Sequence, residues 1–172
     1  MTRPSYQEAI DQLGLLDVLV DFDPVVIGTP PLGIATDKSD IDIACSANNL
    51  DTFATFAKKQ FTHHQDFQLR DVDHLNEPAC VATFKALDWE FELFCQTLKT
   101  SEQWGVRHFI VEQRLLNLCP QLAQGITKLK EDGIKTEPAF AQVLALDGDP
   151  YEAVLKLETY SDEDLQQLIA KR

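Results

Sequence analysis

Two aspartates, Asp40 and Asp42, stand two positions apart inside the otherwise apolar run SDIDIAC, residues 39–45. On a β-strand, side chains two apart point to the same face of the sheet, so both carboxylates would share one face. Magnesium prefers carboxylate oxygens together with the phosphate oxygens of a substrate, and two-metal sites for phosphoryl transfer hold their ions about 3.5–4 Å apart. Taken alone, such a pair is typical of an ordinary solvent-facing strand. Together with a third carboxylate and a turn that could bind phosphate, it would indicate metal-assisted phosphoryl transfer.

A third carboxylate is available in the segment WEFELF, residues 89–94. Its alternation puts Glu90 and Glu92 on one face of a strand and Phe91 and Leu93 on the other. The alternation alone does not decide which glutamate would join the aspartates.

A glycine-bearing turn precedes the aspartates. The β-branched run PVVIG, residues 24–28, predicts a strand that ends at Gly28, and Thr29 follows it. This strand, the Gly-Thr turn, a spacer and then Asp-Ile-Asp-Ile resemble the signature of the DNA polymerase β-like nucleotidyltransferase superfamily. The longer strings GTPPLGIATDKSDIDIAC, FELFCQ and TSEQWGVRHFIVEQRLL, within residues 24–117, resemble a bacterial family of uncharacterised nucleotidyltransferase-like proteins.

The resemblance implies a role for particular residues. Asp40 and Asp42 would be catalytic metal ligands for magnesium, and Glu92, chosen over Glu90 on the resemblance alone, would be the third ligand. The residues expected to bind the nucleotide are Gly28, Thr29, Gly33, Ser39, Arg107 and His108. For Arg107 and His108 an alternative stays open, because charged residues along one helix also form ion pairs that tether it to its neighbours.

The dipeptide Pro30-Pro31 departs from the superfamily pattern. In that pattern a helix begins at the turn and offers free N–H groups to the triphosphate. Proline has no N–H and pushes the preceding residue out of the helical region, so we expect Thr29 to be extended. The phosphate cradle would then be altered, shifted to residues 32–34, or lost.

The expected elements divide the chain into an α/β part, residues 1–96, and a helical part, residues 97–172. A capping-box pattern at Ser5 and Glu8 and a cap at Asn49 predict two early helices. The predicted strands cover residues 24–28, 39–45, 67–72, 79–87 and 89–95, and the predicted helices cover residues 5–16, 50–61 and 102–118, with three more helices after them.

No Gly/Ser/Pro-rich linker separates the two parts, so we expect one compact domain over residues 1–172. Its fold class would be α+β, with a small mixed, twisted sheet of the nucleotidyltransferase type flanked by helices. A helical C-terminal region would pack on that sheet.

The composition limits the possible partners and location. A formal net charge of −13 repels phosphate backbones and disfavours nucleic acid as the main partner. No apolar run is long enough to span a membrane, and the N-terminus lacks a signal-peptide core, so we expect a cytoplasmic protein without a membrane partner. The four cysteines are scattered singly among apolar neighbours, which predicts buried free thiols.

These observations favour a magnesium-dependent nucleotidyltransferase. It would move a nucleoside monophosphate group from a nucleoside triphosphate to the hydroxyl of an unidentified small-molecule or protein acceptor. The alternative is a catalytically silent relative that binds a nucleotide or a protein partner. Pro30-Pro31 favours this alternative, whereas the complete set of three carboxylates disfavours it.

Overall fold

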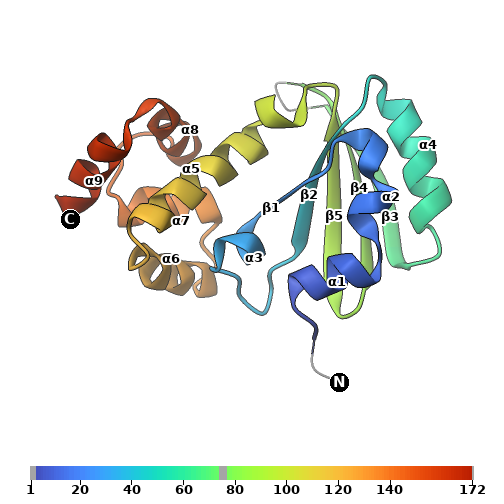
Figure 1. The fold of residues 1–172 in the computed structure, drawn as a ribbon, viewed down its shortest axis with the longest axis horizontal. Coiled ribbons are helices and arrows are strands. Elements are labelled where there is room, and N and C mark those ends of the chain that lie inside the picture. The colour runs from blue at the N-terminus through green and yellow to red at the C-terminus, as the bar shows by residue number, and fades with distance from the viewer. Residues whose placement is uncertain (1–2, 74–76, 172) are drawn as a thin grey trace. The chain divides into compact units, whose positions relative to one another are not determined.

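The computed structural model describes residues 3–73 and 77–171. Its backbone contacts group the chain into two compact units, whose elements are labelled in Figure 1. Unit 1 comprises Met1–Pro31 and Ser39–Val106, and unit 2 comprises Leu32–Lys38 and Arg107–Arg172. The division thus falls ten residues after the boundary expected at residue 96, and it assigns a short early segment to the helical unit. One compact domain with the helical part packed on the sheet stays a prediction.

Unit 1 is built on a mixed sheet. Within the described residues it has five strands in the order β1-β2-β5-β4-β3. Strands β2 and β5 are parallel, and the other neighbours are antiparallel. The strands are β1 (Val25–Ile27), β2 (Ile41–Ser46), β3 (Gln65–Val72), β4 (Ala79–Ala86) and β5 (Trp89–Gln96). The predicted α+β class with a mixed sheet flanked by helices is confirmed.

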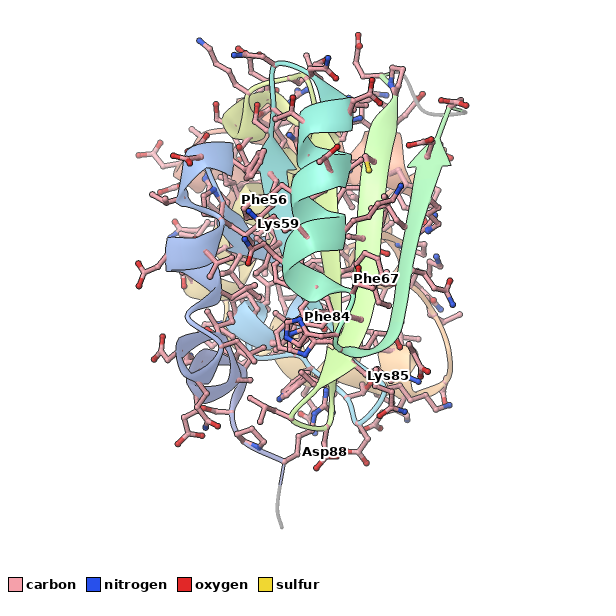
Figure 2. All side chains as sticks on the ribbon, turned by 90° about the vertical axis from the view of Figure 1, so that its right-hand side faces the viewer. Phe56, Lys59, Phe67, Phe84, Lys85 and Asp88 are labelled. Atoms are coloured by element: carbon pink, nitrogen blue, oxygen red, sulfur yellow. The ribbon has the colours of Figure 1, made fainter. Side chains whose placement is uncertain are left out.

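Helices of unit 1 pack on one face of this sheet. They are α1 (Tyr6–Gln12), α2 (Leu15–Val18) and α4 (Leu50–Phe61), and Figure 2 shows α4 lying over the strands. Ser5 and Glu8 form the predicted capping box, and Asn49 caps α4 through its side-chain oxygen. The single helix expected over residues 5–16 is instead broken at Gly14, where φ is +56°. A left-handed backbone conformation cannot continue a right-handed helix.

The alternation along β2 and β5 decides which side chains face the helices. Ile41 and Ile43 on β2 and Phe91 and Leu93 on β5 are buried in the core beneath the helices. The positions between them, which include Asp42 and Glu92, therefore point to the opposite face of the sheet. We call that opposite face the polar face; it also carries Thr83, Gln68 and Arg70, as the strand register requires.

Unit 2 is helical and has a core of its own. Its helices are α5 (Trp104–Leu118, whose first turn belongs to unit 1), α6 (Leu122–Glu131), α7 (Thr136–Val143), α8 (Pro150–Lys156) and α9 (Asp162–Ala170). Ile34, from the short early segment, is buried together with Leu115, Ile126 and Phe140. The predicted helical C-terminal region is therefore confirmed.

Three cysteines, Cys45, Cys80 and Cys95, are buried free thiols as predicted, and Cys119 is half-buried. Burial raises the pKa of the Cys45 thiol to about 12 and that of Cys80 to about 11, so these thiols are inert at neutral pH. Among the helices that the structure describes, none is long and apolar enough to cross a membrane.

Candidate functional site

The strand register places two acidic side chains next to each other on the polar face. Asp42 on β2 is the Cα partner of Glu92 on the parallel strand β5, and of Ile27 on β1. Glu92 is in turn the partner of Thr83 on β4. Directly opposed residues on neighbouring strands point to the same face and lie about 4.8 Å apart at Cα. The carboxylates of Asp42 and Glu92 therefore stand side by side.

The register also distinguishes Glu90 from Glu92, which the alternation of the sequence could not do. Glu90 is exposed and is opposite Lys85 on β4, whereas Glu92 is opposite Asp42. Asp40 was expected inside the strand predicted over residues 39–45, but β2 begins only at Ile41, so Asp40 lies just before the strand. It is nevertheless close enough to Glu92 for its charge to raise the pKa of that carboxyl.

Opposing influences act on the Glu92 carboxyl. Burial is the largest, and it raises the pKa because the charged form loses hydration. Arg70 on β3 acts in the other direction, through a contact of 3.2 Å between its Nη2 and Oε2 of Glu92. The pKa of Glu92 lies above its ordinary value despite this ion pair. The site thus favours additional positive charge.

Gly28 brings the predicted turn into contact with these carboxylates. Its φ is +80°, and a Cβ placed there would overlap Oδ2 of Asp42 and lie 3.2 Å from Cγ. Glycine is required for both reasons, because other residues adopt this conformation only with strain and their Cβ would displace the carboxylate. The backbone of the turn at Gly28 is therefore in close contact with the side chain of Asp42.

The hydroxyls of Thr29 and Ser39 meet beside this turn. Their Oγ atoms are 2.9 Å apart, and Thr29 is buried. Arg3 donates from Nη2 to the backbone carbonyl of Ser39 at 2.6 Å, and its guanidinium lies 3.2 Å from the centre of the Trp89 ring. The segment that leads into β2 is therefore fixed from two sides.

The predicted effect of Pro30-Pro31 is wrong in one respect. Thr29 is not extended: it is the first residue of the short helix α3 (Thr29–Leu32). Proline is tolerated in a first helical turn because the N–H groups there have no partner within the helix, and its fixed φ suits the helix. Both prolines still lack N–H groups, so neither can donate a backbone hydrogen bond to a phosphate.

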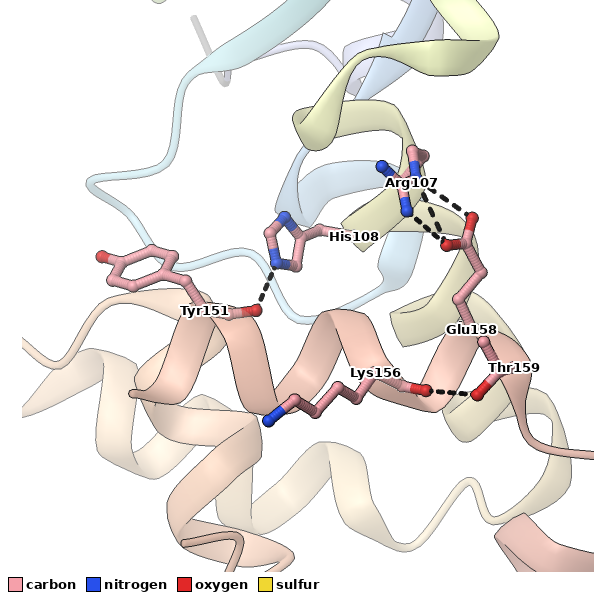
Figure 3. Close-up of polar contacts among 6 residues, drawn as sticks. All are labelled: Arg107, His108, Tyr151, Lys156, Glu158 and Thr159. Atoms are coloured by element: carbon pink, nitrogen blue, oxygen red, sulfur yellow. Dashed lines mark hydrogen bonds and ion pairs between the residues drawn. The ribbon is translucent and has the colours of Figure 1, made fainter. Parts of the chain in front are cut away.

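The remaining predicted nucleotide-binding residues belong to unit 2. Arg107 pairs with Glu158 through two nitrogens, with a shortest distance of 2.6 Å, as Figure 3 shows. His108 is buried, and its Nε2 is 2.8 Å from the carbonyl oxygen of Tyr151. Gly33 follows α3 with φ of +72°, and a Cβ placed there would meet nothing within 4 Å. Nucleotide binding by these three stays a prediction.

One residue of the polar face was not anticipated. Arg70 lies in the predicted strand FQLRDV, but alternation does not reveal which strand will be its neighbour. The order β5-β4-β3 lets Arg70 reach across β4 to Glu92. Only the pairing of strands distant in sequence exposes this contact.

The comparisons with known proteins place the chain in a family. Residues 8–157 match the model of the family described as "Domain of unknown function (DUF4269)". This chain belongs to the DUF4269 family. No curated protein matches the sequence of this DUF4269 member.

Solved structures show that the DUF4269 chain has the nucleotidyltransferase fold. The Cid1 poly(U) polymerase with MgGTP aligns at a TM-score of 0.56 and 14% identity, over 87% of this chain and 47% of Cid1. A cytoplasmic RNA terminal U-transferase aligns at 0.54 and 14%, over 87% and 46%. The GLD-2/RNP-8 complex aligns at 0.53 and 12%, over 80% and 54%. The chain thus spans about half the length of these proteins.

The Cid1 structure contains magnesium with its nucleotide, and the polar face of this chain carries oxygen donors of the kind that magnesium prefers. Among the described residues, no three His, Cys, Asp or Glu side chains are grouped so that they could hold a metal ion by themselves. Two carboxylates with room for substrate phosphates are, however, the usual environment of protein-bound magnesium. Asp42 and Asp40, with Glu92 beside them, supply such oxygens. The donors fit an ion shared with a nucleotide rather than one enclosed by protein.

Proposed function

We propose that this protein is a magnesium-dependent nucleotidyltransferase that moves a nucleoside monophosphate group from a nucleoside triphosphate to an acceptor hydroxyl. The observation that carries the proposal is the register of β2 with β5. It sets Asp42 beside Glu92 on the polar face, with the Gly28 turn in contact with Asp42. The fold shared with nucleotidyltransferases supports the same conclusion.

Each residue of the site has a role in this proposal. Asp40 and Asp42 would hold magnesium, which would supply positive charge for the phosphate oxygens. The hydroxyls of Thr29 and Ser39 donate to the triphosphate, and Gly28 lets it approach the backbone. These donors replace the helix N–H groups that Pro30-Pro31 cannot supply.

The transfer itself is a substitution at phosphorus. An acceptor oxygen attacks the α-phosphorus, and the bond from that phosphorus to the pyrophosphate oxygen breaks. The proton of the acceptor hydroxyl passes to Glu92, whose carboxylate is the third of the set. The protein contributes mainly positioning and charge stabilisation, as in other phosphoryl transfers.

The acceptor distinguishes two forms of the proposal. The structural neighbours include a poly(U) polymerase and an RNA terminal U-transferase, so an RNA 3′ hydroxyl is one candidate. The formal net charge of −13 favours a small-molecule or protein hydroxyl instead. We place the reaction in the cytoplasm in either case.

A second function is favoured by the state of Glu92. Its ion pair with Arg70 occupies the third carboxylate, and the turn carries two prolines. A catalytically silent relative that binds a nucleotide or a protein partner would show the same features.

Pyrophosphate release tests the two functions. The protein is incubated with magnesium and each of the four common ribonucleoside triphosphates, with and without an RNA oligonucleotide that has an unpaired 3′ end. We expect release with at least one nucleotide, and a loss of about 100-fold or more in Asp42→Asn, as when a charge-stabilising group is removed. Asp162→Asn, an acid paired with Arg114 in unit 2, is the matched control and should retain activity. Nucleotide binding without release would favour the silent relative.

A further inference from the structure

We propose that Arg70 is a phosphate-binding residue of this site, held by Glu92 while no substrate is bound and transferred to the nucleotide's phosphates when a divalent cation occupies the carboxylates. The inference rests on the proposed nucleotidyl transfer and assigns the positively charged contact that it lacks. Its basis is the position of Arg70, the weakness of its present ion pair, and the shortage of other charged donors at the turn.

Arg70 reaches the centre of the polar face from the edge of the sheet. It is the Cα partner of Val81 on β4, and Val81 is the partner of Phe94 on β5, two residues beyond Glu92. The side chain therefore crosses β4 diagonally to contact Glu92. Glu92 is the register neighbour of Asp42, so the guanidinium ends one strand away from the proposed magnesium ligand.

The ion pair between Arg70 and Glu92 is of the kind that exchanges easily. The side chain of Arg70 is 55% exposed and that of Glu92 is 33% exposed, and they meet at one distance of 3.2 Å. Arg107, in contrast, grips both carboxylate oxygens of Glu158, the shortest contact being 2.6 Å. Solvent-exposed ion pairs of this kind contribute little to stability. A divalent cation at Asp42, the register neighbour of Glu92, would repel the guanidinium and can therefore release it.

The site needs a charged donor that the turn does not supply. A triphosphate is bound best by positive charge and by several aligned donors, and the forked guanidinium provides both. Pro30 and Pro31 have no N–H, and the hydroxyls of Thr29 and Ser39 are neutral. Arg3 is already engaged with the Ser39 carbonyl and the Trp89 ring. Arg70 is in direct contact with Glu92, at 3.2 Å.

The exchange predicts effects of opposite sign on metal and nucleotide binding. Wild type, Arg70→Ala, Arg70→Lys and Lys85→Ala are titrated with Mn²⁺, followed by electron paramagnetic resonance, and with UTP and ATP in magnesium, followed by calorimetry. Lys85→Ala is the matched control, because Lys85 on β4 forms an exposed ion pair with Asp66 on β3, in the same sheet. Thermal melts confirm that each variant is folded.

We expect Arg70→Ala to bind Mn²⁺ at least as tightly as wild type, since the competing guanidinium is gone. It should bind nucleotide about tenfold more weakly or worse, which corresponds to one lost charge-assisted contact. Arg70→Lys should lie between the two, and Lys85→Ala should match wild type in both titrations.

Three results would overturn the inference. Equal weakening of Mn²⁺ and nucleotide binding in Arg70→Ala would mean that Arg70 only orients Glu92. Unchanged nucleotide binding would mean that the pair is a surface contact, and both results leave the proposed function intact. Absence of any magnesium-dependent nucleotide binding in the wild type would instead reject the proposed function, and this inference with it.

Discussion

The two units use the same charged residue types in opposite ways. In unit 2, arginines of α5 are matched to individual acids: Arg107 pairs with Glu158, and Arg114 pairs with Asp162. On the polar face of unit 1, carboxylates gather instead: burial is the main cause that raises the pKa of Glu92, Arg70 opposes it, and the charges of Asp40 and Glu90 add to it. Matched pairs hold helices together, whereas gathered carboxylates favour a cation. The contrast supports the proposal that the chemistry lies in unit 1.

Glu112 is an exception to this contrast, because it is an acid of unit 2 for which no ion pair is seen among the described residues. It is buried on α5, and its Oε1 has no hydrogen-bond partner among the described residues. Burial, followed by the charge of Glu137, raises its pKa well above the ordinary value, and Lys130 only partly opposes this. Unit 2 therefore contains a buried acid whose raised pKa favours the protonated form, whereas carboxylates that act as metal ligands must be deprotonated.

The largest expected effect compares two glycines with positive φ. Gly28 has φ of +80° and Gly133 has φ of +90°, but a Cβ at Gly133 meets nothing within 4 Å, whereas one at Gly28 overlaps Asp42. Gly133→Ala should cost about 1 kcal/mol through backbone strain alone. Gly28→Ala should cost about 2–4 kcal/mol, because displacement of the carboxylate adds to the strain.

Chemical denaturation of both variants measures this difference, and UTP titration in magnesium follows it. We expect Gly28→Ala to lose nucleotide binding and Gly133→Ala to keep it. Equal costs for the two substitutions would show that the Gly28 turn and Asp42 are not in contact in solution.

The second prediction uses ligand-linked stability to compare acids of the two units. At a hundredfold excess over its dissociation constant, magnesium with UTP should stabilise wild type by about 2.7 kcal/mol. Asp42→Asn should lose this gain, because it lacks a carboxylate that the proposal assigns to magnesium. Asp162→Asn should respond to ligand as wild type does. Thermal melts with and without both ligands decide; an undiminished response in Asp42→Asn would contradict the site.

The third prediction concerns the pH dependence that Glu112 imposes on unit 2. Burial raises the pKa of Glu112 in the folded protein well above its ordinary value of 4.5, so the folded form keeps its proton after the unfolded chain has released it. The contribution to stability is full below pH 4.5 and declines as pH rises toward the folded pKa. Glu112→Gln removes this decline. It should match wild type near pH 4.5 and exceed it by about 1–2 kcal/mol at pH 8, on the scale of one unsatisfied buried group.

Urea denaturation at several pH values measures this difference between Glu112→Gln and wild type, in which the other titrating groups cancel. Lys130 on α6 and Glu137 on α7 are the charged groups that act on Glu112 from neighbouring helices. A gap that stays constant with pH would mean that Glu112 is ionised in the folded protein.

Local sequence patterns predicted most of the fold for identifiable reasons. Alternation in residues 39–45 and 89–95 predicted strands, and it correctly assigned Ile43 and Leu93 to the core. A capping box and an Asn cap predicted two helix starts, since capping depends on residues within one turn. Alternation thus predicts which face of a strand is buried, and caps predict where a helix begins.

The patterns failed where distant segments meet. Glu90 and Glu92 are equivalent by alternation, and only the parallel pairing of β2 with β5 distinguishes them. Arg70 was missed for the same reason, because its contact requires β3 and β5 to flank β4. Long-range register depends on the whole sheet rather than on any single strand.

The smallest expected effect decides how Arg107 should be interpreted. The sequence predicts that Arg107 binds the nucleotide, whereas the structure pairs it with Glu158 in unit 2, as Figure 3 shows. An exposed pair contributes about 0–1 kcal/mol even with both oxygens engaged, so Arg107→Ala should destabilise the protein by less than about 1 kcal/mol.

If Arg107 acts only in this pair, Glu158→Ala should cost the same as Arg107→Ala, and the double variant should cost no more than either. UTP affinity in magnesium should then be unchanged in all three, in contrast to the tenfold or larger loss expected of Arg70→Ala. A loss of affinity in Arg107→Ala but not in Glu158→Ala would restore the nucleotide-binding role, because removal of the acid frees the guanidinium without removing it. One measurement therefore distinguishes the two arginines. The affinity for UTP should fall when Arg70, the partner of Glu92, is removed, and it should not change when Arg107, the partner of Glu158, is removed.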